Sequence, residues 1–331
     1  MPVTSSSVTT IHSLICKRDL PMGLTCLDSM VACSAGEIQF VFHEDGSLLQ
    51  EDLALLSEHY PTSRIVTRKE SDELVCGQLG KYPRCLEFKA NNIFGMKLLD
   101  IPMLSDGLIR YTDCDILYFR RFASLFGNTP AANPLFIRQG DLFDFGKSWR
   151  KWSSYRKHGI TLPPYLNAGL YQFPKALWDL DYIEWFLSLA DLHEPVQLVE
   201  QNCWAAMTRD KGRYFDTNQI YCPQNSALPI TLKPGAVAVH FIYPFKSQFG
   251  DFHGKVQGLR DALEPCDIQT VPAGECDLAY ILKTDSLPTL KRETRRWLRR
   301  KARWVRGLAT GAHEEKSKVS GKQQAPTRPA P

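Results

Sequence analysis

Two acidic residues separated by a single residue follow an apolar run in the middle of the chain. Asp113 and Asp115 close the segment 107–115, in which Leu, Ile and Tyr precede them, and apolar sequence resumes at Ile116. Burying two like charges together is costly unless a cation joins them. Mg²⁺ and Mn²⁺ favour carboxylate and phosphate oxygens, so this pair is suited to hold a divalent ion that also binds a phosphate. The common alternative for an isolated Asp-x-Asp is a pair of solvated loop acids.

Further along the chain, four residues could contribute to a site for a metal ion and a phosphate. His240 and Lys246 follow an apolar run, and Asn167 and Gly169 lie in the segment 165–171. Each has a structural alternative, because a lone histidine after a strand is more often a satisfied core residue and a lone lysine is usually solvated. A glycine in a strand marks a place where a backbone or a ligand approaches closely.

Two residues nearer the start of the chain could contact a nucleotide. Lys89 lies ahead of the acidic pair and could reach a phosphate, although an ordinary solvated lysine is the alternative. Asp45 lies in a His-Glu-Asp-Gly-Ser turn and could contact the base, although turn chemistry alone explains an aspartate there.

Strands and helices alternate in the first half of the chain. Apolar, β-branched runs predict strands at 11–16, 38–43, 64–67 and 107–111. Helical periodicity predicts helices at 23–33, 47–59, 71–79 and 89–99. Ser47 and Gln50 have the spacing of a capping box at the start of the second helix. This alternation predicts an α/β fold with a mostly parallel, doubly wound sheet, which binds ligands beyond the carboxyl ends of its strands.

The second half is less regular. We expect strands at 165–171 and 237–241 and helices at 175–192 and 200–208. The segment 122–164 is rich in aromatic and basic residues, which favours loop and lid over core.

These motifs, in this order, resemble glycosyltransferase family 8, which has the GT-A fold. The segment 111–115 is similar to the family's Asp-x-Asp element, and 165–170 to its Asn-Ala-Gly strand. The segment 240–246 is similar to a His-Phe-x-Gly-x-x-Lys-Pro-Trp element, and 200–202 lies where the family has Asp-Gln-Asp. The likeness covers residues 9 to about 250.

The resemblance implies a Rossmann-like, mostly parallel central sheet flanked by helices and a hexose transferred from a nucleotide sugar, a UDP-sugar with retention, to a glycan or lipid-linked acceptor. The implied ligands of Mn²⁺ or Mg²⁺ are Asp113, Asp115 and His240. The residues expected to contact the donor are Asp45, Lys89, Asp113, Asn167, Gly169 and Lys246. Gln201 is the residue expected to face the reacting centre.

The sequence departs from the family pattern in both halves of the implied site. Tyr243 replaces the glycine of the His-Phe-x-Gly element, and Ser-Gln replaces Pro-Trp after Lys246. Glu200 and Asn202 differ from the two acids usual on the acceptor side.

The implied organisation is one catalytic domain, 1–286, with a nucleotide-binding half at about 9–120 and an acceptor half at about 121–286. A basic amphipathic helix at 287–310 and a disordered tail at 311–331 follow. The chain has no recognisable secretory signal or membrane-spanning run, and its ten cysteines are scattered singly. We therefore expect a cytoplasmic protein.

The end of the chain carries most of the positive charge. From residue 290 onward there are 13 Lys and Arg against 3 Glu, whereas the whole chain has a net charge of +4, so the preceding part carries −6. One face of the helix expected at 290–308 is apolar, with Leu290, Trp297, Leu298, Trp304, Val305 and Leu308. A basic helix with this face fits an anionic membrane surface. Nucleic-acid binding is disfavoured by the acidic body, and a solvated terminus is the plain alternative.

Two other function classes are compatible with parts of the pattern. A haloacid-dehalogenase-type phosphatase also places Asp-x-Asp after a strand, but after its first strand, whereas three expected strands precede the strand that ends here. A non-catalytic, membrane-associated protein that binds sugar nucleotides would keep the fold without the reaction.

Overall fold

The predicted alternation of strands and helices is present in the computed structural model, which describes residues 8–126, 132–139, 149–189, 192, 198–208, 211–224, 227–275 and 298. The strands are β1 (Thr9–Ile15), β2 (Ile38–Glu44), β3 (Arg64–Val66), β4 (Leu108–Thr112), β5 (Ile116–Tyr118), β6 (Leu135–Arg138), β7 (Leu166–Pro174), β8 (Arg213–Phe215), β9 (Ile220–Tyr221), β10 (Ala238–His240) and β11 (Thr270–Pro272). The basic segment 287–310, apart from Leu298, and the tail 311–331 lie outside the described residues.

Most helices differ from the predicted ones only at their ends, but the predicted helix 89–99 is wrong: one helix ends at Asn91, and a separate π-helical turn begins at Met96. They are α1 (Leu20–Cys33), α2 (Gln50–His59), α3 (Arg68–Val75), α4 (Pro83–Asn91), α5 (Ile101–Met103), α6 (Trp149–Lys157), α7 (Leu180–Ser188), α8 (Val199–Thr208), α9 (Phe249–Val256) and α10 (Leu259–Ala262). A π-helical turn, Met96–Asp100, leads into α5. The predicted capping box is wrong: α2 begins after Leu49, whose backbone N–H donates to Asp52, while the Ser47 hydroxyl donates to Asp45.

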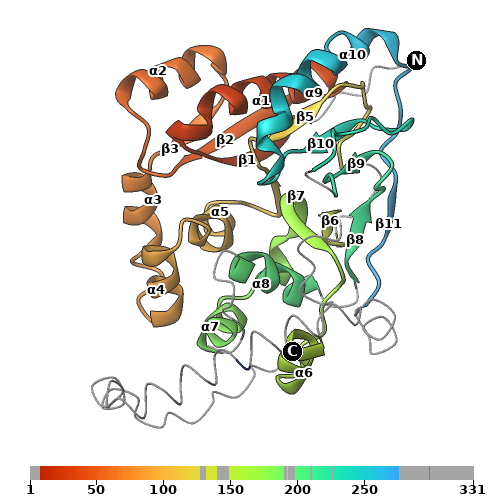
Figure 1. Cartoon of the computed structure of the whole chain (residues 1–331). Helices are drawn as coiled ribbons and strands as arrows, with labels where there is room; N and C mark the ends of the chain where they lie inside the picture. Colours follow the sequence, from red (N-terminus) through yellow and green to blue (C-terminus); the bar gives the residue numbers. More distant parts are fainter. Residues whose placement is uncertain are drawn as a thin grey trace, which may run out of the picture.

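Eight strands form the central sheet in the order β11-β8-β6-β7-β4-β1-β2-β3, with α1 and α2 above β1–β3 and α8 beside β7 in Figure 1. β1, β2, β3 and β4 run parallel, β7 is antiparallel to both β4 and β6, and β11 is antiparallel to β8. Six of the eight strands therefore share one direction, which confirms the predicted mostly parallel sheet. A small second sheet, β5-β10-β9, lies next to it.

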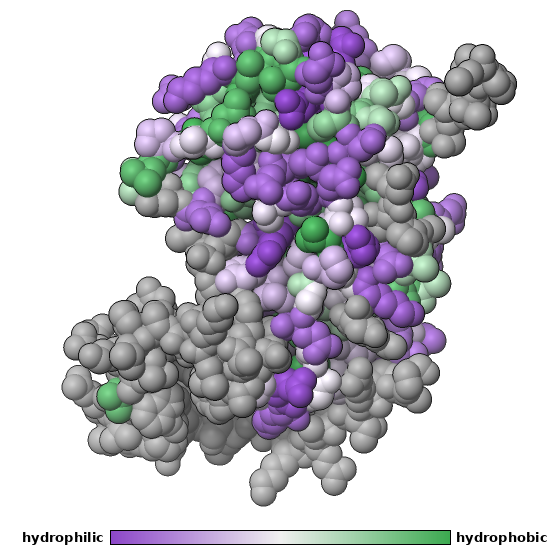
Figure 2. Space-filling model, turned by 90° about the vertical axis from the view of Figure 1, so that its right-hand side faces the viewer, coloured by the Kyte–Doolittle hydropathy of each residue, from purple (hydrophilic) through white to green (hydrophobic). Residues whose placement is uncertain are grey.

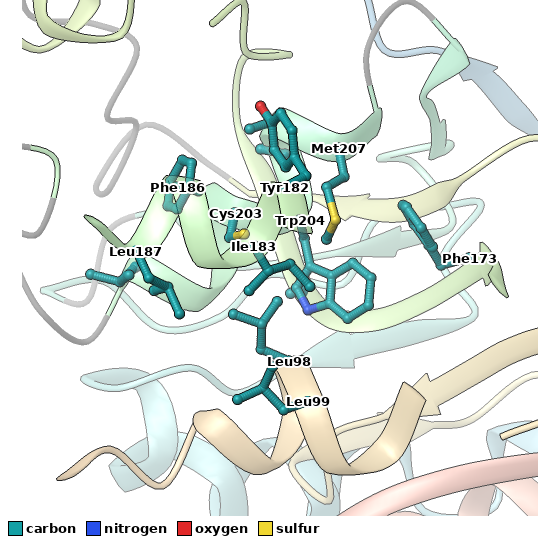
Figure 3. Packing of buried hydrophobic residues seen from close by; sticks show 14 of the residues in the cluster. Leu98, Leu99, Phe173, Tyr182, Ile183, Phe186, Leu187, Cys203, Trp204 and Met207 are labelled. Atoms are coloured by element: carbon teal, nitrogen blue, oxygen red, sulfur yellow. The ribbon is translucent and has the colours of Figure 1, made fainter. Parts of the chain in front are cut away.

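Both faces of the sheet are covered, because successive side chains of a strand point to opposite faces. In β7, Tyr171 and Phe173 join the cluster under α7 and α8, whereas Leu170 joins the cluster under α1. Trp204 of α8 lies at the centre of the first cluster, with its ring centroid 4.8 Å from that of Phe173 and with Leu98 approaching from below (Figure 3). This packing fixes α8 against the strand that carries Asn167 and Gly169.

The segment 122–164, expected to be loop and lid, supplies a buried strand. β6 lies between β7 and β8, and its residues Leu135, Phe136 and Ile137 have no exposed surface. The face that carries β8, β9 and β11 is predominantly hydrophilic where it is described, with smaller hydrophobic areas (Figure 2). Within the described residues, none of the helices is long and apolar enough to cross a bilayer.

Candidate active site

Three strand ends bring the predicted metal ligands together. Asp113 follows β4, and its backbone N–H donates to the Gly169 carbonyl of the neighbouring β7 at 2.5 Å. β10 pairs with β5 so that His240 lies opposite Ile116, and the Phe241 N–H donates to the Asp115 carbonyl at 2.8 Å. Pairing of β4 with β7 in the central sheet and of β10 with β5 in the small sheet therefore brings residues 113, 115 and 240 together.

The three side chains have the geometry of a metal cluster. One ligand atom from each of Asp113, Asp115 and His240 lies within 4.8 Å of the others. His240 Nε2 lies 2.9 Å from Asp115 Oδ1 and 3.6 Å from Asp113 Oδ2. Two carboxylates and an imidazole are a donor set that suits Mn²⁺, so these residues fit the implied ion.

The cluster is charged, and two of its three residues, Asp115 and His240, are buried. Burial acts to lower the pKa of His240, but the Asp115 carboxylate, followed by Cys222, raises it to about 10. Burial also acts to raise the pKa of Asp115, but His240 and Lys246 hold that pKa below its ordinary value. In the ion-free protein an imidazolium thus compensates the acids, and a metal ion must displace its proton.

Two lysines flank the cluster on opposite sides. Lys246 Nζ lies 3.3 Å from Asp115 Oδ2 and 2.9 Å from Asp19 Oδ2. Lys97 Nζ lies 3.1 Å from Asp113 Oδ1, donates to the Ala168 carbonyl at 3.0 Å and lies 4.6 Å from the centre of the Tyr111 ring. Both ammonium groups line the same cavity as the acids.

This cavity, of about 600 Å³, collects most of the predicted site residues. Those that line it are Asp45, Asp113, Asp115, Asn167, Gly169, Gln201, His240 and Lys246. Lys89 is not among them: it is 2% exposed, and its ammonium contacts Asp100 and lies 2.6 Å from Asp72. Lys97 lies in the cavity instead, and sequence reasoning missed it. The signal that could have found it is a lysine inside the apolar run Met-Lys-Leu-Leu.

The polar residues of β7 and α8 face the same space. Gln201 Oε1 accepts the Ala168 N–H at 3.3 Å, and Asn167 Oδ1 accepts the Gly169 N–H at 2.9 Å. Glu200 is 3% exposed, and burial raises its pKa to about 7 despite the opposing attraction of Lys97. Asp113 also acts to raise that pKa. The carboxyl group of Glu200 is therefore able to donate as well as accept a hydrogen bond near neutral pH.

Comparison with known proteins gives the fold its name. No protein-family model matches the sequence, and a search of curated proteins finds no match. The galactosyltransferase LgtC, solved with donor and acceptor sugar analogues, matches with a TM-score of 0.50 and 14% identity over 77% of this chain and 96% of LgtC. The chain has the GT-A fold. An active-site mutant of LgtC matches similarly, with a TM-score of 0.50 and 15% identity over 80% of this chain and 98% of that one.

The GT-A fold confirms the fold predicted from the motifs. The phosphatase alternative rested on Asp-x-Asp after an apolar strand, normally the first. In this chain the acidic pair follows β4, the fourth strand in chain order.

Proposed function

We propose that this protein is a metal-dependent glycosyltransferase that moves a hexose from a nucleotide sugar, a UDP-sugar, to a glycan or glycolipid. The observation that carries the proposal is the meeting of Asp113, Asp115 and His240 in a cavity that two lysines share. Nucleotide sugars present a diphosphate to such a cluster, and the leaving of that diphosphate is the step that needs positive charge.

The three ligands would hold Mn²⁺, or Mg²⁺, beneath the diphosphate. When bound, the ion neutralises negative charge that develops on the departing nucleoside diphosphate. The Asp115 carboxylate keeps His240 Nε2 turned toward the cluster, and Cys222 Sγ lies 3.6 Å from Nδ1 on the other side of the ring. Contacts on both ring nitrogens fix the direction in which His240 offers its lone pair.

Lys97 and Lys246 would bind the phosphate oxygens that the metal ion does not contact. Lys246 is shared between Asp19 and Asp115, so an arriving phosphate can replace one carboxylate as its partner without leaving a buried charge alone. Burial acts to lower the pKa of Lys97, but Asp113 and Glu200 keep that pKa above its ordinary value. Both groups are therefore charged at neutral pH.

The sugar and the acceptor would meet at the α8 side of the cavity. Gln201 uses its carbonyl oxygen on the Ala168 N–H, which leaves its NH₂ group for a substrate oxygen near the reacting centre. Asn167 and Gly169 would line the donor sugar, and Asp45, beyond β2, would contact the nucleoside. Retention at the anomeric carbon is part of the proposal on the strength of the family resemblance.

Metal-dependent donor binding tests the assignment. Asp115→Asn should abolish Mn²⁺-dependent binding of UDP in calorimetry while the circular dichroism spectrum without metal remains that of the folded protein. Unchanged Mn²⁺-dependent binding would refute the metal site. Slow Mn²⁺-dependent hydrolysis of a UDP-sugar by the wild type separates the enzyme from a non-catalytic binding protein, which binds the donor without cleaving it.

We also propose that the protein works at an anionic membrane surface, which would make the acceptor lipid-linked. The support is the charge and apolar pattern of 290–308, where each Lys or Arg adds about 1 kcal/mol of attraction near such a surface. Replacing Arg295, Arg296, Arg299 and Arg300 by Gln should release the protein from phosphatidylserine vesicles in co-sedimentation at low salt. Equal binding by this variant would show that the segment is not the anchor.

A further inference from the structure

A second pocket shares none of its described lining residues with the main cavity but contacts two residues of the active site. It has a volume of about 140 Å³ and is partly open to solvent. Gln139 and Cys222 are among the residues that line it. Gln139 Oε1 accepts a hydrogen bond from Asn167 Nδ2 at 3.3 Å, and Cys222 Sγ lies 3.6 Å from His240 Nδ1. A ligand here would touch the residues that hold the donor and the metal ligand.

The pocket is cationic. Arg138 and Lys233 line it, and none of its described lining residues is an Asp or a Glu. The Arg138 guanidinium lies over the Tyr165 ring at 5.0 Å, and Lys233 Nζ lies over the Tyr221 ring at 4.3 Å. Lys233 also donates to the Thr217 carbonyl. Among the described residues, neither cation forms an ion pair with a carboxylate, although Asp216 acts on Lys233 from further away. Two cations held by aromatic rings without a counter-ion form a site for an anion.

The backbone at this pocket is strained in a way that supports a binding role. Tyr165 has a φ of 65°, in the left-handed region that a residue with a side chain rarely adopts. Strain of this kind persists where the surrounding structure imposes it, and it collects at binding sites. Here the conformation accompanies the placement of the Tyr165 ring beneath Arg138, immediately before β7 begins at Leu166.

We propose that this Arg138–Lys233 pocket binds a phosphate or carboxylate group carried by the acceptor, so that the preferred acceptor is an acidic glycan. The inference rests on the proposed function. The volume is below that of a pocket for a whole small molecule, which suits one oxyanion group of a larger ligand. Gln139 and Asn167 link this group to the sugar-binding end of the main cavity, which is where an acceptor must lie.

Matched acceptors test the proposal. Transfer should be measured to a neutral methyl hexoside, to its 6-phosphate and to the corresponding uronic acid. We expect kcat/KM for one or both acidic acceptors to exceed that for the neutral one by tenfold or more. The double variant Arg138→Gln/Lys233→Gln should lose this preference and keep its rate with the neutral acceptor. Lys255→Gln, which removes an exposed lysine of α9, should keep the preference.

Two further measurements separate the possible failures. Titration of the intact protein with inorganic phosphate should show binding that the double variant lacks. If the wild type binds phosphate there but does not discriminate between acceptors, the pocket takes a free anion and the acceptor assignment is overturned. If the double variant keeps both the phosphate binding and the acidic preference, the pocket is not an anion site. If the wild type does not hydrolyse a UDP-sugar at all, that result would instead refute the proposed function.

Discussion

Gly169 has no side chain because the ring of His240 occupies the space that one would fill. A Cβ at residue 169 would lie 2.1 Å from His240 Cε1 and 2.9 Å from Asn167 Oδ1. The glycine carbonyl also accepts the N–H of Asp113. One residue therefore sets the approach of β7 to both the first acid and the histidine of the cluster. A glycine within a strand indicates that another group approaches the backbone closely, and at Gly169 that group is the His240 ring.

Gly169→Ala should displace His240 and weaken Mn²⁺-dependent UDP binding by about tenfold or more, as loss of a support to a metal ligand commonly does. Calorimetry with and without Mn²⁺ measures the effect. Gly254→Ala is the matched control, because nothing lies within 4 Å of the methyl group it adds. Equal metal-dependent affinity in the two variants would show that His240 is not a ligand.

The residues most easily predicted from the sequence are those whose position along the chain determines their place in the fold. Asp113 and Asp115 follow a strand, so their place at the edge of the sheet is set by local pattern. Lys97 could not be placed in this way, because its contact with Asp113 depends on how the π-helical turn packs against β4 and α8. Lys89 looked equally available in the sequence, but the acids that surround it come from two distant segments.

At the scale of elements, the alternation of apolar runs was enough to predict β1, β2, β3 and β4 within one or two residues. β6 was missed because its four residues lie between stretches rich in aromatic and basic side chains, and only its neighbours β7 and β8 make it a buried strand. The start of α2 was misjudged because Ser47 has competing partners: its hydroxyl accepts the Lys17 N–H and donates to Asp45.

The elements α3, α4 and the π-helical turn meet at a buried ion pair. Lys89 and Asp100 are 2% and 0% exposed, and Ser71 donates its hydroxyl to the same carboxylate. Lys89→Met removes the cation and leaves Asp100 without a matching charge, which should reduce the free energy of unfolding by about 3–5 kcal/mol. Urea unfolding measures this loss.

Lys69→Met is the control for that experiment. Lys69 belongs to α3 but its side chain is 88% exposed and lies 3.9 Å from Glu73, so its removal should change the stability by less than about 1 kcal/mol. The affinity for UDP should be the same in the folded fraction of the wild type, Lys89→Met and Lys69→Met. If the Lys89→Met protein has normal stability but weaker UDP binding, Lys89 contacts the donor as first predicted.

At the scale of the whole molecule, stability against acid depends on groups in both halves. His12 of β1 and His43 of β2 lie in the core, with His12 Nδ1 2.9 Å from His43 Nε2 and His12 Nε2 3.0 Å from the hydroxyl of Ser105. Burial, assisted by the charge of Arg64, lowers the pKa of His12 to about 4. Burial, His12 and Arg64 also place the pKa of His43 well below its ordinary value.

Both histidines are therefore neutral in the folded chain and take up protons in the unfolded chain near pH 6.5. Their contribution to stability is complete above that pH and is lost as the pH falls toward 4, by up to about 1.4 kcal/mol per pH unit for each residue. Glu200 acts in the opposite direction, since its raised pKa of about 7 makes the folded chain bind the extra proton between about pH 4.5 and 7. The pH dependence of the free energy of unfolding is therefore a sum of opposing contributions. The contribution of the two histidines has to be measured by comparing the wild type with a variant that lacks them.

The double variant His12→Asn/His43→Gln provides that difference. It should be less stable than the wild type at pH 7.5, because it disturbs a packed polar contact between two central strands. Its deficit in the free energy of unfolding should shrink as the pH falls from 6.5 to 5, since only the wild type loses stability when these two histidines take up protons in the unfolded chain. Urea unfolding at four pH values measures the deficit, with His59→Gln on the exposed side of α2 as the control. A deficit that stays constant across this range would mean that the two rings take up protons as readily in the folded chain as in the unfolded chain.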